Sequence, residues 1–148
     1  MLLIARCCIT ILITAFVAAC APSGKNVAFT VIVEGNSASD YPTPQGKVIS
    51  SEADWASLQR QLGADLAMQT ALPSVDFTQS QLVAVFAGEK PSGGYSVAVR
   101  EIVESDREII VYVTLEAPDS SQIVITAITY PYQIVRMPRT SLPARFVF

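Results

Sequence analysis

The chain has 148 residues, with 10 lysines and arginines against 13 aspartates and glutamates, which gives a formal net charge of −3. It has no histidine, and its three cysteines, Cys7, Cys8 and Cys20, all lie near the N-terminus. These counts exclude Ser-His-Asp and Cys-His catalysis and a His/Cys zinc site in the rest of the chain. The acidic balance also argues against a nucleic-acid partner, which needs clustered lysine and arginine.

The first residues are predicted to be a targeting signal rather than part of the fold. Arg6 precedes an apolar run from Cys7 to Ala19, which is shorter than the ~20 apolar residues of a membrane span and fits the core of a signal peptide. The run ends in small residues before Cys20, an arrangement that resembles the lipobox of bacterial lipoproteins. We therefore expect a signal peptide over residues 1–19.

The lipobox resemblance implies that Cys20 becomes the acylated first residue of the mature chain and anchors it in the bacterial envelope. Two or more acyl chains, palmitate among them, give stable anchoring, and we expect no cofactor beyond this covalent lipid. Ala21 stands where related lipoproteins retained in the inner membrane carry aspartate, so the outer membrane is expected. The alternative is an ordinary secretory signal in which Cys20 is incidental.

After a short polar tether over residues 20–26, a single domain is predicted over residues 27–148. Val27 to Glu34 alternates, with its odd-numbered apolar residues on one face, and predicts a first strand. Gly35 to Gly46 is rich in Gly, Asn, Ser, Asp and Pro, so it predicts a loop. Lys47 to Ser50 is a candidate short strand.

The clearest helix is predicted near residues 52–62. Ser51 is a suitable N-cap, and the acidic residues that follow it favour the positive end of the helix dipole. Trp55, Leu58 and Leu62 form one apolar stripe, and we interpret Trp55 as a core residue. Gly63 ends the helix, and residues 64–71 are a candidate weak helical turn.

The rest of the chain is predicted to be β-structure. Leu82 to Ala87 is apolar on both faces, as in a central covered strand. Tyr132 to Met137 lies between two prolines, which favours an edge position or sharp ends. The fold is therefore expected to be mainly β (α+β), an antiparallel sheet or sandwich of about six to eight strands with one packed helix. The further strands expected are Tyr95–Val99, Ile109–Glu116, Ile123–Thr129 and Arg145–Phe148.

The remaining chemistry gives no strong active site. The carboxylates around one hairpin loop, Glu101 to Glu108, lack the spacing and glycine of a calcium loop, so no metal is expected. Asp76 with Glu89 is a conceivable carboxylate pair for glycoside hydrolysis. Ser92 with Lys90 is a conceivable nucleophile and base, although nothing in the sequence buries the lysine. We expect no catalytic residues.

The segment Gly88 to Tyr95, GEKPSGGY, is interpreted as a rigid binding loop. It lacks the GK[ST] ending of a phosphate loop, and a strand rather than a helix follows it. Its two consecutive glycines suit a positive φ or a close contact, and Tyr95 faces either a partner or the core. If Tyr130-Pro131-Tyr132 lies at the same end of the sheet, the two segments form one surface. The candidate protein-interaction residues are Pro91, Ser92, Gly93, Gly94, Tyr95, Tyr130, Pro131 and Tyr132.

Several segments between Phe29 and Met137 together resemble the C-terminal domain of the PrcB family of protease complex subunits. The segments are VIVEGNSAS, VISSEADW, VDFTQSQLVAVFAGEKPSGGYSVAV and TYPYQIVRMPR. The last one departs mildly from the family, which commonly finishes in an IPK-like sequence where this chain has Met137-Pro138-Arg139. Since the family is named for a lipoprotein subunit of a surface protease complex, the resemblance implies a noncatalytic, protein-binding accessory role beside a protease or another envelope protein.

Two other functions and a purely structural role stay open at this point. Pro91 to Tyr95, PSGGY, is similar to the PTTGY-type loop of chagasin-like cysteine-protease inhibitors, although their RPW-type loop is not found here. An inhibitor-like domain that uses this loop is one alternative. An enzyme that works through carboxylates without histidine or cysteine is another, and a structural envelope lipoprotein is the third.

Overall fold

The computed structural model describes residues 24–63, 72 and 74–148. The expected signal peptide, Cys20 and the helical turn expected at residues 64–71 lie outside this part of the chain. Within it, no helix has both the length and the apolar character needed to cross a membrane.

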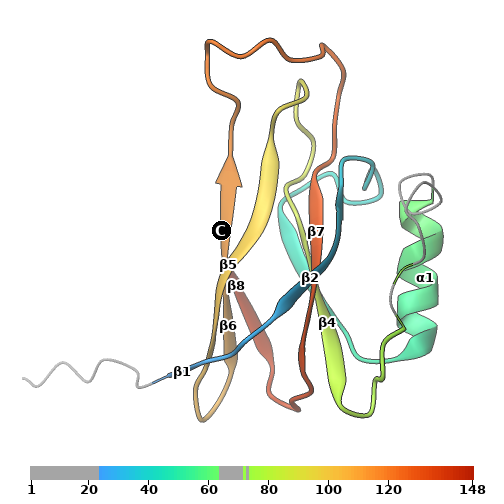
Figure 1. Ribbon diagram of the computed structural model, residues 1–148, viewed down its shortest axis with the longest axis vertical. Coiled ribbons are helices and arrows are strands. Elements are labelled where there is room, and N and C mark those ends of the chain that lie inside the picture. Colours follow the sequence, from blue (N-terminus) through green and yellow to red (C-terminus); the bar gives the residue numbers. More distant parts are fainter. Residues whose placement is uncertain (1–23, 64–71, 73) are drawn as a thin grey trace, which may run out of the picture.

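In the described residues, the domain is a sandwich of two four-stranded sheets with one helix, which confirms the mainly β fold (Figure 1). The first sheet has the strand order β1-β5-β6-β8 and the second has the order β2-β7-β4-β3. All neighbouring strands are antiparallel except β6 and β8. In chain order the elements are β1 (Lys25–Asn26), β2 (Thr30–Gly35), β3 (Gln45–Ile49), α1 (Glu52–Leu62), β4 (Ser80–Phe86), β5 (Ser96–Glu104), β6 (Ile109–Glu116), β7 (Tyr132–Pro138) and β8 (Ala144–Val147).

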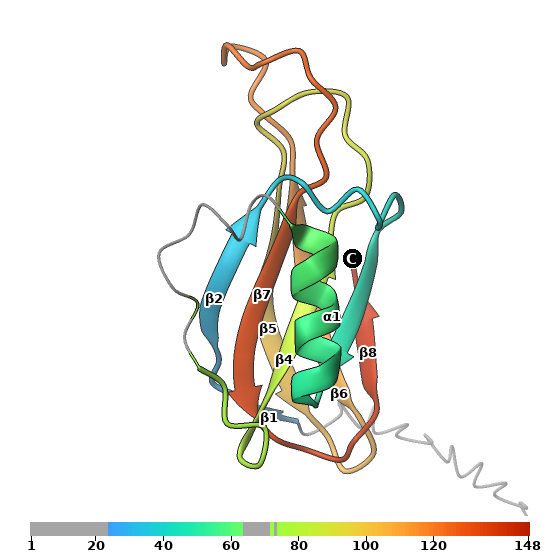
Figure 2. The ribbon, with the colours of Figure 1, turned by 90° about the vertical axis from the view of Figure 1, so that its right-hand side faces the viewer.

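Helix α1 covers the outer face of the second sheet, so this sheet is the middle of three layers (Figure 2). One core cluster lies between α1 and the second sheet, and the other lies between the two sheets. The strands β4 and β7 contribute side chains to both clusters. This double coverage explains why Leu82 to Ala87 is apolar on both faces, as expected.

Strand β7 is central, between β2 and β4, and not at an edge. Pro131 precedes the strand and Pro138 is its last residue, so neither proline removes an N–H from the middle of the ladder. The alternative expectation, that the prolines mark sharp strand ends, is therefore confirmed.

Helix α1 begins and ends where the sequence predicts. The hydroxyl of Ser51 accepts a hydrogen bond from the backbone N–H of Asp54, and Gly63 is the C-cap. Trp55, Leu58 and Leu62 are at most 3% exposed and face the second sheet. The apolar stripe is thus the packing face of the helix, and Trp55 is a core residue.

The first expected strand is divided between the two sheets. Lys25 and Asn26, expected in the tether, form β1, and the backbone N–H of Val27 donates to Ile102 on β5. The chain then crosses to the second sheet, where the register of β2 against β7 shifts between Val31 and Val33. This irregularity breaks the alternation, so Val31 is 47% exposed while Val33 is buried. The single-face assignment was wrong because a bulge reverses the side-chain direction.

The strand expected at residues 123–129 is also not formed. The segment is a loop, and Ile123, Ile125 and Ile128 are 104%, 68% and 60% exposed. Strand β6, which precedes it, pairs with β5 along its length and with β8 over Ile109–Tyr112. Alternating hydrophobicity did not make a strand here; instead, Ile125 and Thr129 form backbone hydrogen bonds with Gly93 and Lys90 in the loop between β4 and β5.

Candidate functional site

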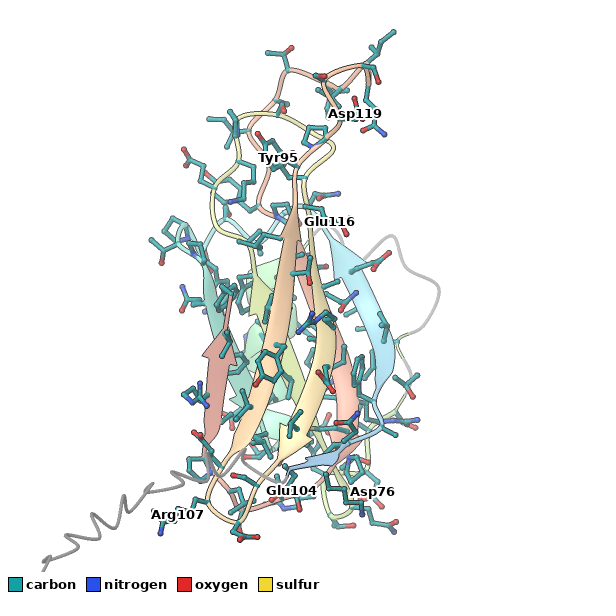
Figure 3. All side chains as sticks on the ribbon, turned by 90° about the vertical axis from the view of Figure 1, so that its left-hand side faces the viewer. Asp76, Tyr95, Glu104, Arg107, Glu116 and Asp119 are labelled. Atoms are coloured by element: carbon teal, nitrogen blue, oxygen red, sulfur yellow. The ribbon has the colours of Figure 1, made fainter. Side chains whose placement is uncertain are left out.

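Two long loops lie together at one end of the sandwich, beyond the ends of the sheets (Figure 1). They are residues 88–95, between β4 and β5, and residues 117–131, between β6 and β7; we call the pair the loop tip. Figure 3 shows Tyr95 and Asp119 at this end and Glu104 and Arg107 at the opposite end. The sequence left open whether the two candidate segments lie at the same end, and the structure places them there.

Hydrogen bonds join the two loops into one unit. Lys90 and Thr129 exchange backbone hydrogen bonds of 2.8 and 3.0 Å, and the Thr129 hydroxyl donates to the Ser92 carbonyl at 2.8 Å. Farther out, the Gly93 N–H donates to the Ile125 carbonyl at 3.0 Å. Because one partner in every bond is backbone, the two loops are held largely by their main chains.

A side-chain bond adds to this connection. The Tyr130 hydroxyl donates to the Glu89 carboxylate at 2.8 Å. This hydrogen bond, with smaller contributions from desolvation and the negative charge of Glu89, raises the pKa of Tyr130 above its usual value. The phenol therefore stays a neutral donor at physiological pH.

The two consecutive glycines fit the loop tip for different reasons. Gly94 has φ +83°, and a Cβ there would lie 2.8 Å from Pro118 Cβ and from Val124 Cγ1. At Gly93 the backbone is ordinary, but a Cβ would lie 2.8 Å from Ile125 Cγ1. The expected uses of the pair, a positive φ and a close contact, are both present.

The base of the loop tip is fixed to the second sheet. Gly88 has φ +78°, and the next residue, Glu89, donates its N–H to the Pro42 carbonyl at 3.0 Å. Beside it, the Tyr41 ring stacks on Phe86 with centroids 3.8 Å apart. Burial raises the pKa of Tyr41, and the charge of Asp40 adds to the shift. These contacts give the loops a rigid base.

Not all the expected interaction residues reach the surface. Tyr132 is 1% exposed in the core beneath α1, and Pro131 is also buried. Pro131 immediately precedes β7 and Tyr132 is its first residue, where the chain enters the middle of the second sheet, and both line the depression between the end of β2 and the start of β5. Tyr130 and Tyr95 are half-buried. The Lys90 Nζ lies 5.9 Å from the Tyr95 ring centroid, so Tyr95 is neither a core residue nor fully exposed.

The residues that dominate the exposed surface were missed by the sequence analysis. Ile123, Ile125 and Ile128 stand out from residues 117–131, and Val124 between them packs over Gly94. The available signal was their alternation with smaller residues, but a strand and an extended surface loop share this pattern. Gly93, at the centre of the PSGGY segment, is buried beneath Ile125. Any surface that PSGGY offers is therefore shared with the second loop.

Two depressions open beside the loop tip and meet at Asn36. The first, of about 300 Å³, lies between the end of β2 and the start of β5 and is lined by Glu34, Tyr95 and Val97 among others. The second, of about 580 Å³, lies between the loops and is lined by Gly93, Ile123 and Ile125 among others. Because Asn36 lines both, the two depressions adjoin at this residue, and we call the pair the groove.

The conceivable catalytic pairs are not assembled. Asp76 precedes β4 and Glu89 follows it, so the seven residues of the strand separate them by roughly 23 Å. Ser92 donates to the Gly93 carbonyl at 3.1 Å, while Lys90 lies over Tyr95. The described residues hold no group of three or more Asp, Glu, His or Cys that would suit a metal ion.

The C-terminal arginines act largely within the domain. Arg145 pairs with Glu108 at 3.0 Å, and this hydrogen bond with the charge of Glu108 raises the pKa of the arginine. Arg139 donates to the backbone carbonyls of Ser50 and Phe77 at 2.9 and 2.6 Å. These two arginines therefore fasten loops at the end opposite the loop tip.

Fold and site together define a small β-sandwich domain in which the most exposed large apolar side chains of the described residues lie on a pair of hydrogen-bonded loops. Residues 82–138, which run from β4 to the end of β7 and include the whole loop tip, match the family model described as PrcB C-terminal. The resemblance inferred from the sequence is therefore confirmed over this part of the chain. No curated protein and no solved structure matches the chain significantly.

Proposed function

We propose that this protein is a noncatalytic accessory subunit, anchored in the bacterial envelope by a lipid on Cys20, that binds another envelope protein through its loop tip. The observation that carries the proposal is the exposure of Ile123, Ile125 and Ile128 on loops fixed by main-chain hydrogen bonds. Exposed apolar residues on a rigid support are typical of protein-binding surfaces. The PrcB C-terminal match supports the accessory role, and a protease is the partner that the family name suggests.

The position of the N-terminus supports a role away from the anchoring membrane. Lys25 pairs with Glu104, and Glu104 lies at the end of the sandwich opposite Asp119 (Figure 3). A lipid a few residues before β1 attaches the domain by that end. The loop tip then points away from the membrane, toward proteins of the surrounding compartment.

The charge of the loop tip favours protein over lipid as its partner. Residues 117–131 contain Asp119 and no lysine or arginine, and residues 88–95 contain Glu89 and Lys90. Lys90 is engaged over the Tyr95 ring. Surfaces that bind anionic bilayers are usually rich in basic residues, and this one is not.

The proposal is tested with a photo-crosslinking amino acid at residue 125 of the full chain, expressed in its own cells. We expect one discrete crosslinked envelope protein, and mass spectrometry identifies it. The same crosslinker at Ser57, on α1, is the matched control and should not give this product. The identified partner is then purified, and its affinity for the full chain is measured.

A triple substitution, Ile123→Ser, Ile125→Ser and Ile128→Ser, separates the interface from the fold. Since these side chains are largely exposed, we expect the free energy of unfolding to change by no more than about 0.5 kcal/mol per site. Affinity for the partner should fall at least about tenfold. A triple variant that keeps full affinity would contradict the proposal, as would crosslinking that is equal at residues 57 and 125.

A further inference from the structure

The two long sides of the sandwich are closed differently. On one side β3 and β8 meet, and Gly46 lies directly against the Phe146 ring, where no Cβ would fit. On the other side β1 pairs only with Val103 and Glu104, at the far end of β5. Among the residues that the structure describes, the first half of β5 therefore has no strand paired to its outer edge, which lies beside the end of β2.

The backbone at this edge has a defined direction. The N–H of Val99 points away from β6 and donates to the buried side chain of Gln133 at 2.9 Å. Because alternate residues of a strand present their N–H and C=O groups on the same side, those of Val97 also point outward. Val97 lines the first depression of the groove. One donor and one acceptor of β5 are thus presented to the groove.

The edge also lacks the usual protection against pairing. Natural edge strands carry lysine, proline or a bulge that prevents another chain from adding to the sheet. Residues 96–99 are Ser-Val-Ala-Val, with neither charge nor proline, and the bulge of β5 comes only after Val99. An extended segment can therefore reach Val97 without meeting such an obstacle.

A negative charge lies beside the same edge. The Gln133 side-chain amide accepts a hydrogen bond from the Val99 N–H and donates one to the Glu34 carboxylate at 3.3 Å. Gln133 therefore bridges Glu34 and β5. Glu34 also lines the first depression. Within a chain of net charge −3, this carboxylate favours a lysine or arginine on whatever occupies the groove.

We propose that an extended segment of a partner protein adds as a strand to the edge of β5 at Val97 and continues along the groove to Ile125. The segment has apolar residues at alternate positions and a lysine or arginine facing Glu34. Main-chain hydrogen bonds to Val97 give affinity, and contacts with the loop tip give specificity. This inference rests on the proposed function, because it names the kind of partner segment that the loop tip receives.

The test uses a displayed library of random twelve-residue peptides, selected on the purified full chain. We expect the selected peptides to share alternating apolar residues and one lysine or arginine. Glu34→Gln should weaken their binding about threefold, and the loss should shrink at high salt. Selection that yields no such peptides would overturn the inference.

Two substitutions at Val97 isolate the main-chain contact. Val97→Pro removes the outward N–H without breaking a bond to β6, and it should weaken peptide binding at least about tenfold. Val97→Ile keeps the N–H and should stay within about twofold of the original affinity. Equal binding to both variants would overturn the inference.

Hydrogen exchange gives a measurement that does not depend on how well Val97→Pro folds. In the original chain the Val97 amide should exchange fast when free, and a selected peptide should slow it at least about tenfold. An amide that stays fast in the complex contradicts strand addition. If Val97 is unaffected while the triple isoleucine variant loses the crosslinked partner, the inference fails and the proposed function stands.

Discussion

The two ends of the sandwich are closed by different kinds of contact. At the end near β1, charged side chains fasten the loops: Arg145 pairs with Glu108, and Arg139 donates to two backbone carbonyls. At the loop tip, the connections shown are mainly hydrogen bonds to the main chain, and the isoleucines that stand out from it are 60% to 104% exposed. One end therefore uses its long side chains to hold the fold together, while the other leaves them facing solvent.

This difference separates residues that serve stability from residues that serve contact. Fully burying an isoleucine contributes about 1.5–3 kcal/mol, a contribution that the exposed isoleucines do not make to this fold. The arginines at the opposite end already have partners within the domain. Substitutions at the β1 end should therefore lower stability, whereas those on exposed side chains of the tip should lower binding.

The largest stability effect is expected at the loop tip backbone, in Gly94→Ala. A residue with a Cβ at φ +83° costs roughly 1–2 kcal/mol, and the contacts with Pro118 and Val124 add to that cost. We expect the free energy of unfolding to fall by about 2 kcal/mol. Urea unfolding measures the loss, and faster exchange of the Gly93 amide locates it, because that N–H binds Ile125 across the tip.

Gly94→Asn is the matched control, since asparagine tolerates positive φ better than alanine does. It should lose less stability than Gly94→Ala. Equal losses would show that the contacts with Pro118 and Val124, rather than the backbone angle, demand glycine. No loss in either variant would mean that the tip rearranges freely, which would contradict its rigid support.

A smaller effect is expected at the other end, in Arg139→Met. Methionine keeps much of the length but removes the donors to the Ser50 and Phe77 carbonyls. A hydrogen bond contributes about 0.5–1.5 kcal/mol, and the exposure of this site reduces it, so a loss near 1 kcal/mol is expected. Arg139→Lys keeps the charge but not the planar guanidinium, so it should recover only part of the lost stability. A Met variant as stable as the original would remove the contrast between the two ends.

The sequence predicted the parts of the fold that depend on local signals. Helix α1 was located from Ser51, its apolar stripe and Gly63, and β4 from its continuous apolar run. The errors came where the sheet as a whole decides. The bulge after Val31 and the missing strand at residues 123–129 depend on which segments pair with each other, and a single sequence does not show this.

The candidate site was predicted in part for the same reason. Turn chemistry located the glycines of residues 88–95, because positive φ is a local demand. The side-by-side position of the second loop follows from β5 and β6 being neighbours, which requires the topology. The burial of Tyr132 was not predicted, because an aromatic residue beside a proline has the same sequence signature on a surface loop and at the start of a buried strand.

The smallest expected effect is the acid titration of two similar carboxylates, Asp76 near the β1 end and Asp119 at the tip (Figure 3). The pKa of Asp76 is lowered mainly by a hydrogen bond from the Thr78 hydroxyl and secondly by one from the Thr78 amide. The pKa of Asp119 is lowered mainly by the Ser121 amide and secondly by the Ser121 hydroxyl. Because both folded-state values are lowered, the stabilisation is present above the ordinary value of 3.8 and is lost as pH falls through the lower folded-state value. Carboxyl carbon shifts followed by NMR measure both titrations.

Asn substitutions at the two sites are the controls, since asparagine keeps an acceptor oxygen but does not titrate. In Asp119→Asn the change in the NMR shift of the Ser121 amide on acidification should disappear. In Asp76→Asn the corresponding change at the Thr78 amide should disappear. An ordinary titration of both carboxyls would contradict the loop geometry at each end. If Asp119 alone titrates at its ordinary value, the tip is less ordered in solution than the β1 end, and its isoleucines would then be presented on a mobile support.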